Sequence, residues 1–439
     1  MEVEPCDGFS LVKLLLPDKK HQENEVIKAK QEADEEIYAS HHHKSIGTTG
    51  FFKACFNGLN ALSGVGLVSV PYALSKGGWL SLILLFIISV VTWYTGLLIR
   101  RCMDLNSSIK TYPDIAEHAF GYKGRMAVSI LLHLELYLVA TGFLISEGDN
   151  LHNLLPDMVV LEVAGLKIGG SKQSFVVIIA LIILPSVWLD DLSIVSYISV
   201  SGVLASFIVI GSTAWAGAVD GVGFHRRGVL VSLAGLPTTV SLYTFCYCAH
   251  PVFPTLYTSM KHKHQFSQVL LLCFVISTIG YASMAVMGYL MFGSSVKSQV
   301  TLNLPIEKLS SRIAICTTLI NPITKYALMI TPIRAAFENG LPRRYNKGPI
   351  RLLIRTTLLI STVIVALVFP FFGYLMALVG AFLSAIASML LPCICYLKIF
   401  GNNQGLGYEP VIIMGILLFG ISVVVVGTYT SLAQIIQRL

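Results

Sequence analysis

Eleven long apolar runs, separated by short polar stretches, follow one another along the chain after residue 50. A bilayer core about 30 Å thick requires roughly 20 apolar residues per helix, so runs of this length predict membrane-spanning helices. The predicted spans are residues 51–74, 79–99, 126–146, 173–189, 193–218, 232–257, 267–291, 313–333, 352–370, 372–397 and 410–435. The pattern predicts an all-α, polytopic membrane protein whose two ends lie on opposite sides of the membrane.

The composition agrees with this pattern. Asp, Glu, Lys and Arg make up 13% of the 439 residues, and apolar, aromatic and cysteine residues make up 54%. Soluble globular chains carry about 25% charged residues, so an ordinary water-soluble enzyme is nearly excluded. The charges are concentrated in residues 1–50, a polar, net acidic segment without an apolar signal sequence. This segment predicts a disordered cytosolic tail ahead of a transmembrane domain at residues 51–435.

Charged residues in the loops set the expected orientation and partners. Lys and Arg are more frequent in the loops on the side of the N-terminal tail, which places that side in the cytosol. The basic excess suits an anionic lipid bilayer, and no basic stripe with interleaved aromatic residues indicates nucleic acid. No metal or cofactor is expected, because the pairs Cys246/Cys248 and Cys393/Cys395 stand two residues apart, on different helix faces.

Two of the eleven runs carry helix-breaking residues at bilayer depth. Residues 57–71 of the first run include three Gly, two Asn and a Pro, and residues 243–254 of the sixth include a His and two Pro. Proline removes a hydrogen-bond donor, and glycine costs about 1 kcal/mol in a helix, so both runs are expected to unwind near mid-membrane. Unwound backbone is tolerated at that depth only where it lines a cavity.

The first and sixth of eleven spans hold equivalent positions in two five-helix repeats of opposite topology. We expect repeats at residues 51–218 and 232–397, followed by an extra helix at residues 410–435. Interrupted helices in matching places indicate a secondary-transporter binding site, where exposed N–H groups suit a carboxylate and freed carbonyls suit an ammonium group or cation. A zwitterion such as an amino acid fits both ends. The alternative is that the glycines are helix-packing positions and the prolines simple kinks.

Two charged side chains are expected to lie deep in the membrane. Glu135 is about nine residues from either end of its span, roughly 14 Å at 1.5 Å per residue, which is too far to reach water. It is therefore a candidate proton carrier, or else a protonated carboxyl group bonded to a helix carbonyl. Lys325 either extends toward Arg334 and the cytosol or points inward, where its ammonium would replace a coupling sodium ion between the first and eighth spans.

His250 stands beside the predicted break of the sixth span. Its imidazole can titrate near neutral pH, so it joins Glu135 and Lys325 as a candidate proton-coupling group. The alternative is a hydrogen-bonded packing residue.

Several strings in the sequence resemble the amino acid/auxin permease family and, within it, the vacuolar amino acid transporter branch of plants and fungi. They are Asn60-x3-Gly64-x-Gly66-x4-Pro71-Tyr72-Ala73, Tyr94-Thr95-Gly96, Thr111-Tyr112-Pro113-Asp114-Ile115, Ala119-Phe120-Gly121, Phe245-x-Tyr247-x2-His250-x-Val252-Phe253-Pro254 and Asn321-Pro322-x2-Lys325-Tyr326. The resemblance implies a LeuT-like inverted-repeat fold with eleven helices. It also implies proton-linked movement of neutral amino acids, in this branch commonly by exchange into an acidic vacuole.

The resemblance also places substrate contacts in the two breaks. The implied positions are Asn60, Ala61, Ser63, Gly64, Val65, Gly66, Tyr243, Phe245, Cys246 and Tyr247. One departure from the branch stands beside them: where the branch usually has Ser-Gly-His-Ala, this chain has Cys248-Ala249-His250-Pro251, which adds a Cβ and a proline at the break.

The sequence therefore predicts a secondary active transporter of small neutral amino acids, driven by a proton gradient, at the vacuolar membrane. It is not predicted to be an enzyme, because no convincing catalytic constellation occurs. Two alternatives stay open: a plasma-membrane importer of amino acids or auxin, and a non-transporting amino-acid sensor whose tail contacts cytosolic partners.

Overall fold

A computed structural model describes residues 47–155, 162–163, 166–167, 171–188, 195–340, 342, 348–401 and 408–438. Almost all of the predicted cytosolic tail lies outside the described residues. The chain from Thr49 onward groups into one unit, which contains all the helices and strands described.

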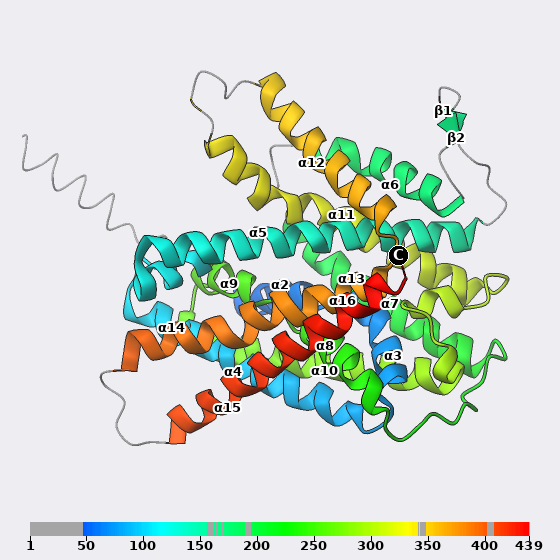
Figure 1. Ribbon diagram of the computed structural model, residues 1–439, viewed down its shortest axis with the longest axis horizontal. Helices are drawn as coiled ribbons and strands as arrows, with labels where there is room; N and C mark the ends of the chain where they lie inside the picture. The colour runs from blue at the N-terminus through cyan, green and yellow to red at the C-terminus, as the bar shows by residue number, and fades with distance from the viewer. Residues whose placement is uncertain are drawn as a thin grey trace, which may run out of the picture. The chain divides into compact units, whose positions relative to one another are not determined.

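Helices make up nearly all of the described chain (Figure 1). In chain order they are α2 (Phe51–Leu62), α3 (Gly66–Gly77), α4 (Ser81–Leu105), α5 (Tyr112–Leu154), α6 (Ser171–Trp188), α7 (Val195–Ala218), α8 (Leu236–Cys246), α9 (Phe253–Ser259), α10 (Phe266–Phe292), α11 (Leu309–Gly340), α12 (Gly348–Val368), α13 (Phe372–Val379), α14 (Leu391–Phe400), α15 (Tyr408–Ser422) and α16 (Thr428–Ile436). An antiparallel pair of two-residue strands, β1 (Glu162–Val163) and β2 (Leu166–Lys167), lies between α5 and α6.

Short helical segments of other types connect or interrupt these helices. The 3-10 segments are η1 (Leu233–Gly235), η2 (His250–Val252), η3 (Lys263–Gln265), η4 (Gly293–Ser295) and η5 (Val300–Asn303). The π-helical segments are η6 (Gly380–Ser384) and η7 (Ile386–Leu390), between α13 and α14, and η9 (Val423–Gly427), between α15 and α16.

Eight of the described helical stretches are long and apolar enough to cross a membrane. They are Ser81–Leu105, Tyr112–Leu154, Ser199–Ala218, Lys263–Ser295, Leu309–Glu338, Gly348–Val368, Phe372–Phe400 and Tyr408–Ile436. Lys172–Trp188 is a shorter apolar helix, and the predicted first and sixth spans are each divided into two short helices. The all-α polytopic class is thereby confirmed, and the exact number of eleven spans stays a prediction.

Large apolar side chains also cover outward-facing helix surfaces. Ile83, Phe86 and Val90 of α4 are exposed, as lipid-facing residues would be.

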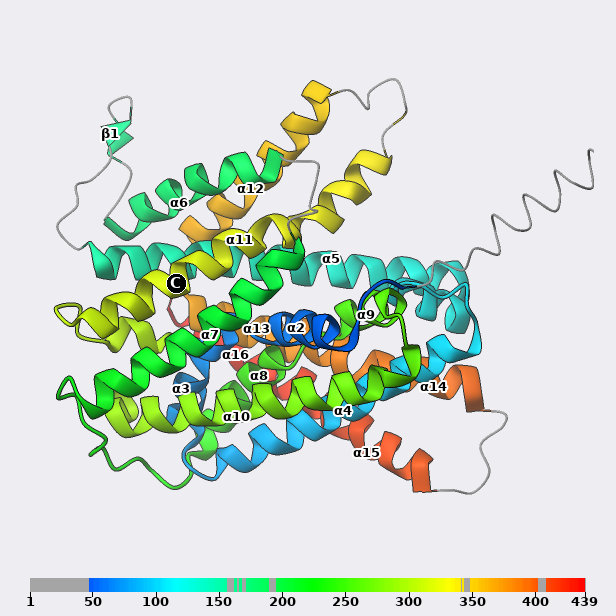
Figure 2. The ribbon, with the colours of Figure 1, turned by 180° about the vertical axis from the view of Figure 1, so that it is seen from behind.

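The long helix α5 separates two groups of helices (Figures 1 and 2). On one side α6, α11 and α12 pack against α5 and against one another. On the other side lie α4, α8, α10 and the chain from α13 to α16 (Figure 2). We call the first group, which comprises α5, α6, α11 and α12, the scaffold.

Both runs that contain Gly and Pro are broken, as predicted. α2 ends at Leu62 and α3 begins at Gly66, so residues 63–65 belong to neither helix. α8 ends at Cys246 and η2 begins at His250, so residues 247–249 are also outside helices. The first break lies upstream of Pro71, which is inside α3.

The predicted third span, residues 126–146, is too short. α5 continues to Leu154 and carries Glu147 and Asn150, both fully buried. Glu147 is therefore a further buried charge on this helix besides Glu135, and the expectation of two charges deep in the membrane stays a prediction. A hydropathy criterion ends a span at the first charged residue, whereas the helix continues because protein, rather than lipid, surrounds its polar side chains.

Candidate substrate and proton-coupling site

The two breaks touch at the centre of the bundle. A Cβ placed on Gly66, the first residue of α3, would lie 2.9 Å from the Sγ and 3.3 Å from the Cα of Cys246, the last residue of α8. Such an approach requires glycine, because a larger residue would separate the two backbones. Two of the predicted substrate positions, which come from different spans, are thus adjacent in space.

Lys325 of α11 reaches the break of the first span. Its Nζ donates to the carbonyl oxygens of Asn60, at 2.9 Å, and Ser63, at 2.5 Å, and the residue is only 5% exposed. In a continuous helix these oxygens would accept from the N–H groups of Gly64 and Leu67. Of the two orientations left open by the sequence, Lys325 therefore has the inward one, and its ammonium replaces hydrogen bonds that the break removes.

Other polar groups of the first break have no partner in the part of the chain that the structure describes. These are the Oδ1 of Asn60 and the Oγ of Ser63, both of which are buried. A cavity of about 20 Å³ adjoins Gly64 and Val65 and lies against α7 and α11. It has room for about one water molecule.

The aromatic positions of the sixth span pack against neighbouring helices. Tyr243 and Tyr247 are fully buried. The Tyr243 hydroxyl lies 3.5 Å from the Oγ of Ser81, and the Tyr247 hydroxyl donates to the Oγ1 of Thr278 at 2.9 Å. Phe245, like Ala61 in the first span, is partly buried against the core. All ten predicted substrate positions thus lie in the breaks or in the helix turns beside them, and their role in binding stays a prediction.

Glu135 contacts the break of the sixth span. Its Oε1 accepts from the Oγ of Ser384, at 2.6 Å, and from the Sγ of Cys248, at 3.3 Å. Ser384 ends the π-helical segment η6, and Cys248 lies between α8 and η2. The carboxyl group therefore links the scaffold helix α5 to the unwound residues 247–249 and to the π-helical segment η6.

His250 lies on the other flank of the same break. Its Nε2 is 2.9 Å from the Oγ1 of Thr95 and 3.1 Å from the carbonyl oxygen of Thr92, both on α4. Because a carbonyl only accepts, we assign the proton to Nε2. The Nδ1 has no partner among the described atoms. His250 thus satisfies the packing interpretation, and its part in proton coupling stays a prediction.

Comparison with known proteins identifies the family of this chain. A family model described as "Transmembrane amino acid transporter protein" matches residues 47–433. The chain belongs to this family. Amino acid transporter AVT1I of Arabidopsis thaliana is 56% identical over 393 residues, which are 89% of this chain and 96% of the relative. Amino acid transporter AVT1J of the same plant is 57% identical over 397 residues, 89% of this chain and 93% of the relative.

Solved transporter structures share the fold of this family member. MhsT in complex with L-phenylalanine superposes with a TM-score of 0.56 at 11% identity, covering 86% of this chain and 98% of that one. A Na+-coupled sialic acid symporter superposes with a TM-score of 0.53 at 12% identity, covering 88% of this chain and 90% of that one. At such identities the likeness concerns the fold alone. The relatives and structures together confirm the amino acid/auxin permease resemblance, its vacuolar branch and the LeuT-like fold.

A buried polar cluster lies at the C-terminal end of α5. It was not predicted from the sequence. The hydroxyl of Ser146 and the amide nitrogen of Asn150 donate to the Oε1 of Gln299, at 2.6 and 2.7 Å. Thr301 donates to the Oδ1 of Asn150 at 2.7 Å. Neither carboxylate oxygen of nearby Glu147 has a partner among the described residues. The spacing of Ser146 and Asn150, four residues apart on one helix face, becomes informative only once α5 extends past residue 146.

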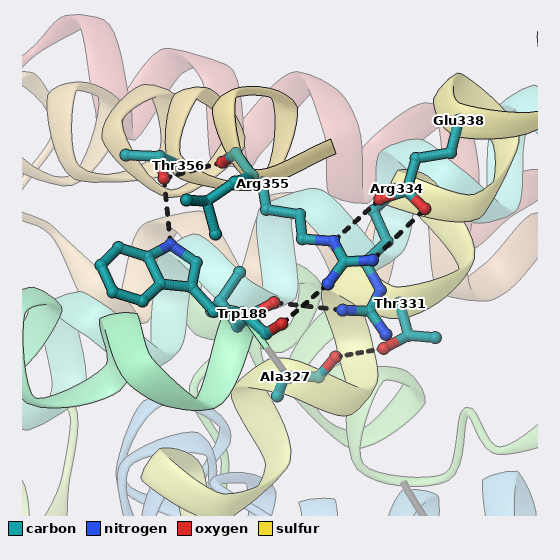
Figure 3. A network of polar contacts seen from close by, with 9 residues as sticks. Trp188, Ala327, Thr331, Arg334, Glu338, Arg355 and Thr356 are labelled. Atoms are coloured by element: carbon teal, nitrogen blue, oxygen red, sulfur yellow. Dashed lines mark hydrogen bonds and ion pairs between the residues drawn. The ribbon is translucent and has the colours of Figure 1, made fainter. Parts of the chain in front are cut away.

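A second cluster missed by sequence reasoning lies within the scaffold (Figure 3). The guanidinium of Arg355, on α12, donates to Glu338 of α11 and to the carbonyl oxygen of Trp188 at the end of α6. Arg334, one turn before Glu338, donates to the carbonyl oxygen of Val187 at 3.1 Å. The i, i+4 spacing of Arg334 and Glu338 was the available signal, whereas pairing with Arg355 depends on tertiary structure.

Proposed function

We propose that this protein is a secondary active transporter that moves small neutral amino acids across the vacuolar membrane, coupled to a proton gradient. Its relatives are named amino acid transporters. The breaks supply carbonyl ends at α2 and α8, which suit an ammonium group, and an N–H end at α3, which suits a carboxylate. Apolar neighbours such as Ala61, Val65 and Phe245 favour an uncharged side chain on the substrate.

The position of the Lys325 ammonium is the observation that carries this proposal. It takes the carbonyl oxygens of Asn60 and Ser63, the kind of unwound-helix oxygens that coordinate a coupling sodium ion in other transporters. An amino group held at this point supports coupling to protons instead of sodium.

Glu135 is the proposed proton carrier. Ionised, its carboxylate can accept from both Cys248 and Ser384, and protonated, it gains a donor of its own. Proton binding would therefore alter the hydrogen bonds that hold the break of the sixth span. The Nδ1 of His250 offers a second protonation point on the opposite flank.

Alternating access would follow from rocking of the first, second, sixth and seventh spans against the rest. Protons and substrate can each shift the balance of inward and outward states only by binding one state more tightly. The contact between Glu135 on the scaffold and Cys248 in the sixth span crosses the surface along which that movement would occur.

Flux of radiolabelled amino acids in proteoliposomes tests the proposal. A pH gradient of either sign is imposed in sodium-free buffer, and sodium is added in a parallel series. We expect accumulation that reverses with the sign of the gradient and is indifferent to sodium. A requirement for sodium would refute the coupling, and absence of counterflow would favour a sensor. Imaging of the tagged protein separates the vacuolar from the plasma membrane.

A further inference from the structure

Tyr281, on α10, reaches both broken spans at once. Its hydroxyl lies within hydrogen-bond distance of the carbonyl oxygen of Leu62, the last residue of α2, and 3.0 Å from that of Cys246, the last residue of α8. The side chain is 1% exposed, and its ring makes an edge contact with Tyr247, the centroids 5.4 Å apart. One buried hydroxyl thus stands between carbonyl groups that the two breaks leave without helical partners.

A phenol hydroxyl has a single proton, and here it meets two acceptors. The C-terminal ends of α2 and α8 also carry partial negative charge, so their carbonyl groups repel one another when they approach. A donor between them offsets that repulsion and is most effective when both carbonyl groups are close. The contact of Gly66 with Cys246 shows that the breaks do approach closely.

The other end of the first span is attached to the sixth by backbone bonds. The N–H of Thr49 donates to the carbonyl oxygen of Ser259 at 3.0 Å, and the N–H of Lys261 donates to that of Thr49 at 2.9 Å. α2 is thus joined to the end of α9 near its start and, through Tyr281, to α8 at its end. Lys325 differs, because its ammonium donates to oxygens of the first span only.

We propose that Tyr281 is a positioning residue that ties the first and sixth spans together through one shared hydroxyl proton, so that the two breaks open and close as a unit. This role deepens the proposed transport function. We call the two hydrogen bonds of the Tyr281 hydroxyl, to Leu62 and to Cys246, the tie. Transport kinetics test it only if the protein is a transporter, whereas hydrogen–deuterium exchange detects it whether or not the protein transports.

Hydrogen–deuterium exchange of the purified protein tests the tie directly. Two peptides are followed, one covering residues 60–68 and one covering residues 244–252. In Tyr281→Phe, exchange in both peptides should accelerate about tenfold, because each local opening loses a competing hydrogen bond. Acceleration in one peptide only, or in neither, would overturn the shared tie.

Two control variants separate the tie from general loosening. Tyr289→Phe removes a hydroxyl from the same helix, where it accepts from the N–H of Val229 at 2.8 Å, and should leave both peptides unchanged. Lys325→Met should accelerate exchange in the peptide of the first span alone. Equal acceleration of both peptides by either control would also overturn the proposal.

A second substitution covers the case in which Tyr281→Phe fails to fold. Incorporation of 3-fluorotyrosine at position 281 keeps the ring and makes the hydroxyl a stronger donor. Exchange in both peptides should then slow relative to the wild type. Unchanged rates in both peptides would refute the tie.

Transport kinetics supply the last test. If the tie coordinates the moving spans, Tyr281→Phe should lower the maximal rate of amino acid exchange about tenfold and change KM less than about threefold. Wild-type kinetics in the variant would overturn the positioning role. If the wild type itself moves no amino acid, the proposed function fails, while the exchange measurement still decides whether the tie exists.

Discussion

Two buried cations of this protein have different surroundings. Arg355 of the scaffold is 4% exposed and pairs with the carboxylate of Glu338, with Nε at 2.8 Å from Oε1 and Nη2 at 3.4 Å from Oε2 (Figure 3). Lys325 of the site is equally buried, but it donates to backbone carbonyl oxygens, and no described carboxylate lies within ion-pair distance. The scaffold pairs its cation with a carboxylate, whereas the amino group of Lys325 is held by neutral acceptors alone.

The largest effect on stability is expected in the scaffold. Arg355→Met removes the ion pair with Glu338 and the bond to the carbonyl oxygen of Trp188, and it should lower the free energy of unfolding by about 3 kcal/mol, because breaking a buried ion pair is strongly destabilising. The double variant Arg355→Met/Glu338→Met should recover most of that loss. Denaturation in mixed detergent micelles measures both. Thr356→Val is the control, because it removes only the 3.1 Å bond from the indole of Trp188, and a loss as small as that control's would contradict the scaffold interpretation.

A pair of glycines tests how tightly the site itself is packed. Gly66→Ala should lower the free energy of unfolding by about 2 kcal/mol and slow transport, because the new Cβ forces α3 away from Cys246. Gly64→Ala is the matched control, since a Cβ there meets no atom within 4 Å. Thermal unfolding is compared for both, because Gly64 is itself a predicted substrate position and flux would not separate the two effects. Equal loss of stability in the two variants would show that the breaks are not in close contact.

Lys325→Met should have a smaller effect on stability than Arg355→Met or Gly66→Ala. Two carbonyl groups lose a donor, but the cost of burying an amino group is also removed. We therefore expect the free energy of unfolding to fall by about 1 kcal/mol. Transport should nevertheless fall at least about tenfold, because the cation that holds the first break is gone. If Lys325→Met unfolds as readily as Arg355→Met, or transports at the wild-type rate, Lys325 and Arg355 do not differ in role as proposed.

Much of this arrangement could be predicted from the sequence, and the missing part has physical causes. Gly, Asn and Pro in the first span and two Pro in the sixth predict both breaks, because these residues weaken helices wherever they occur. The orientation of Lys325 could not be chosen, since a long side chain can extend either way until its neighbours are known. Tyr281 carried no signal at all: one tyrosine in an apolar run acquires its meaning only from the two chain segments that fold against it.

The smallest expected effect on stability, and the most specific effect on function, belongs to Glu135. Glu135→Gln keeps an acceptor for Ser384 and Cys248 but removes the titratable proton, so stability should change by less than about 1 kcal/mol. Amino acid binding should persist, while uptake should lose its dependence on the pH gradient. Glu147→Gln, which changes a buried carboxyl group about three turns further along the same helix, is the matched control and should retain that dependence. Because both variants delete one buried carboxyl group from α5, loss of pH dependence in Glu147→Gln alone would transfer the proton-carrying role from the break of the sixth span to the cluster around Gln299.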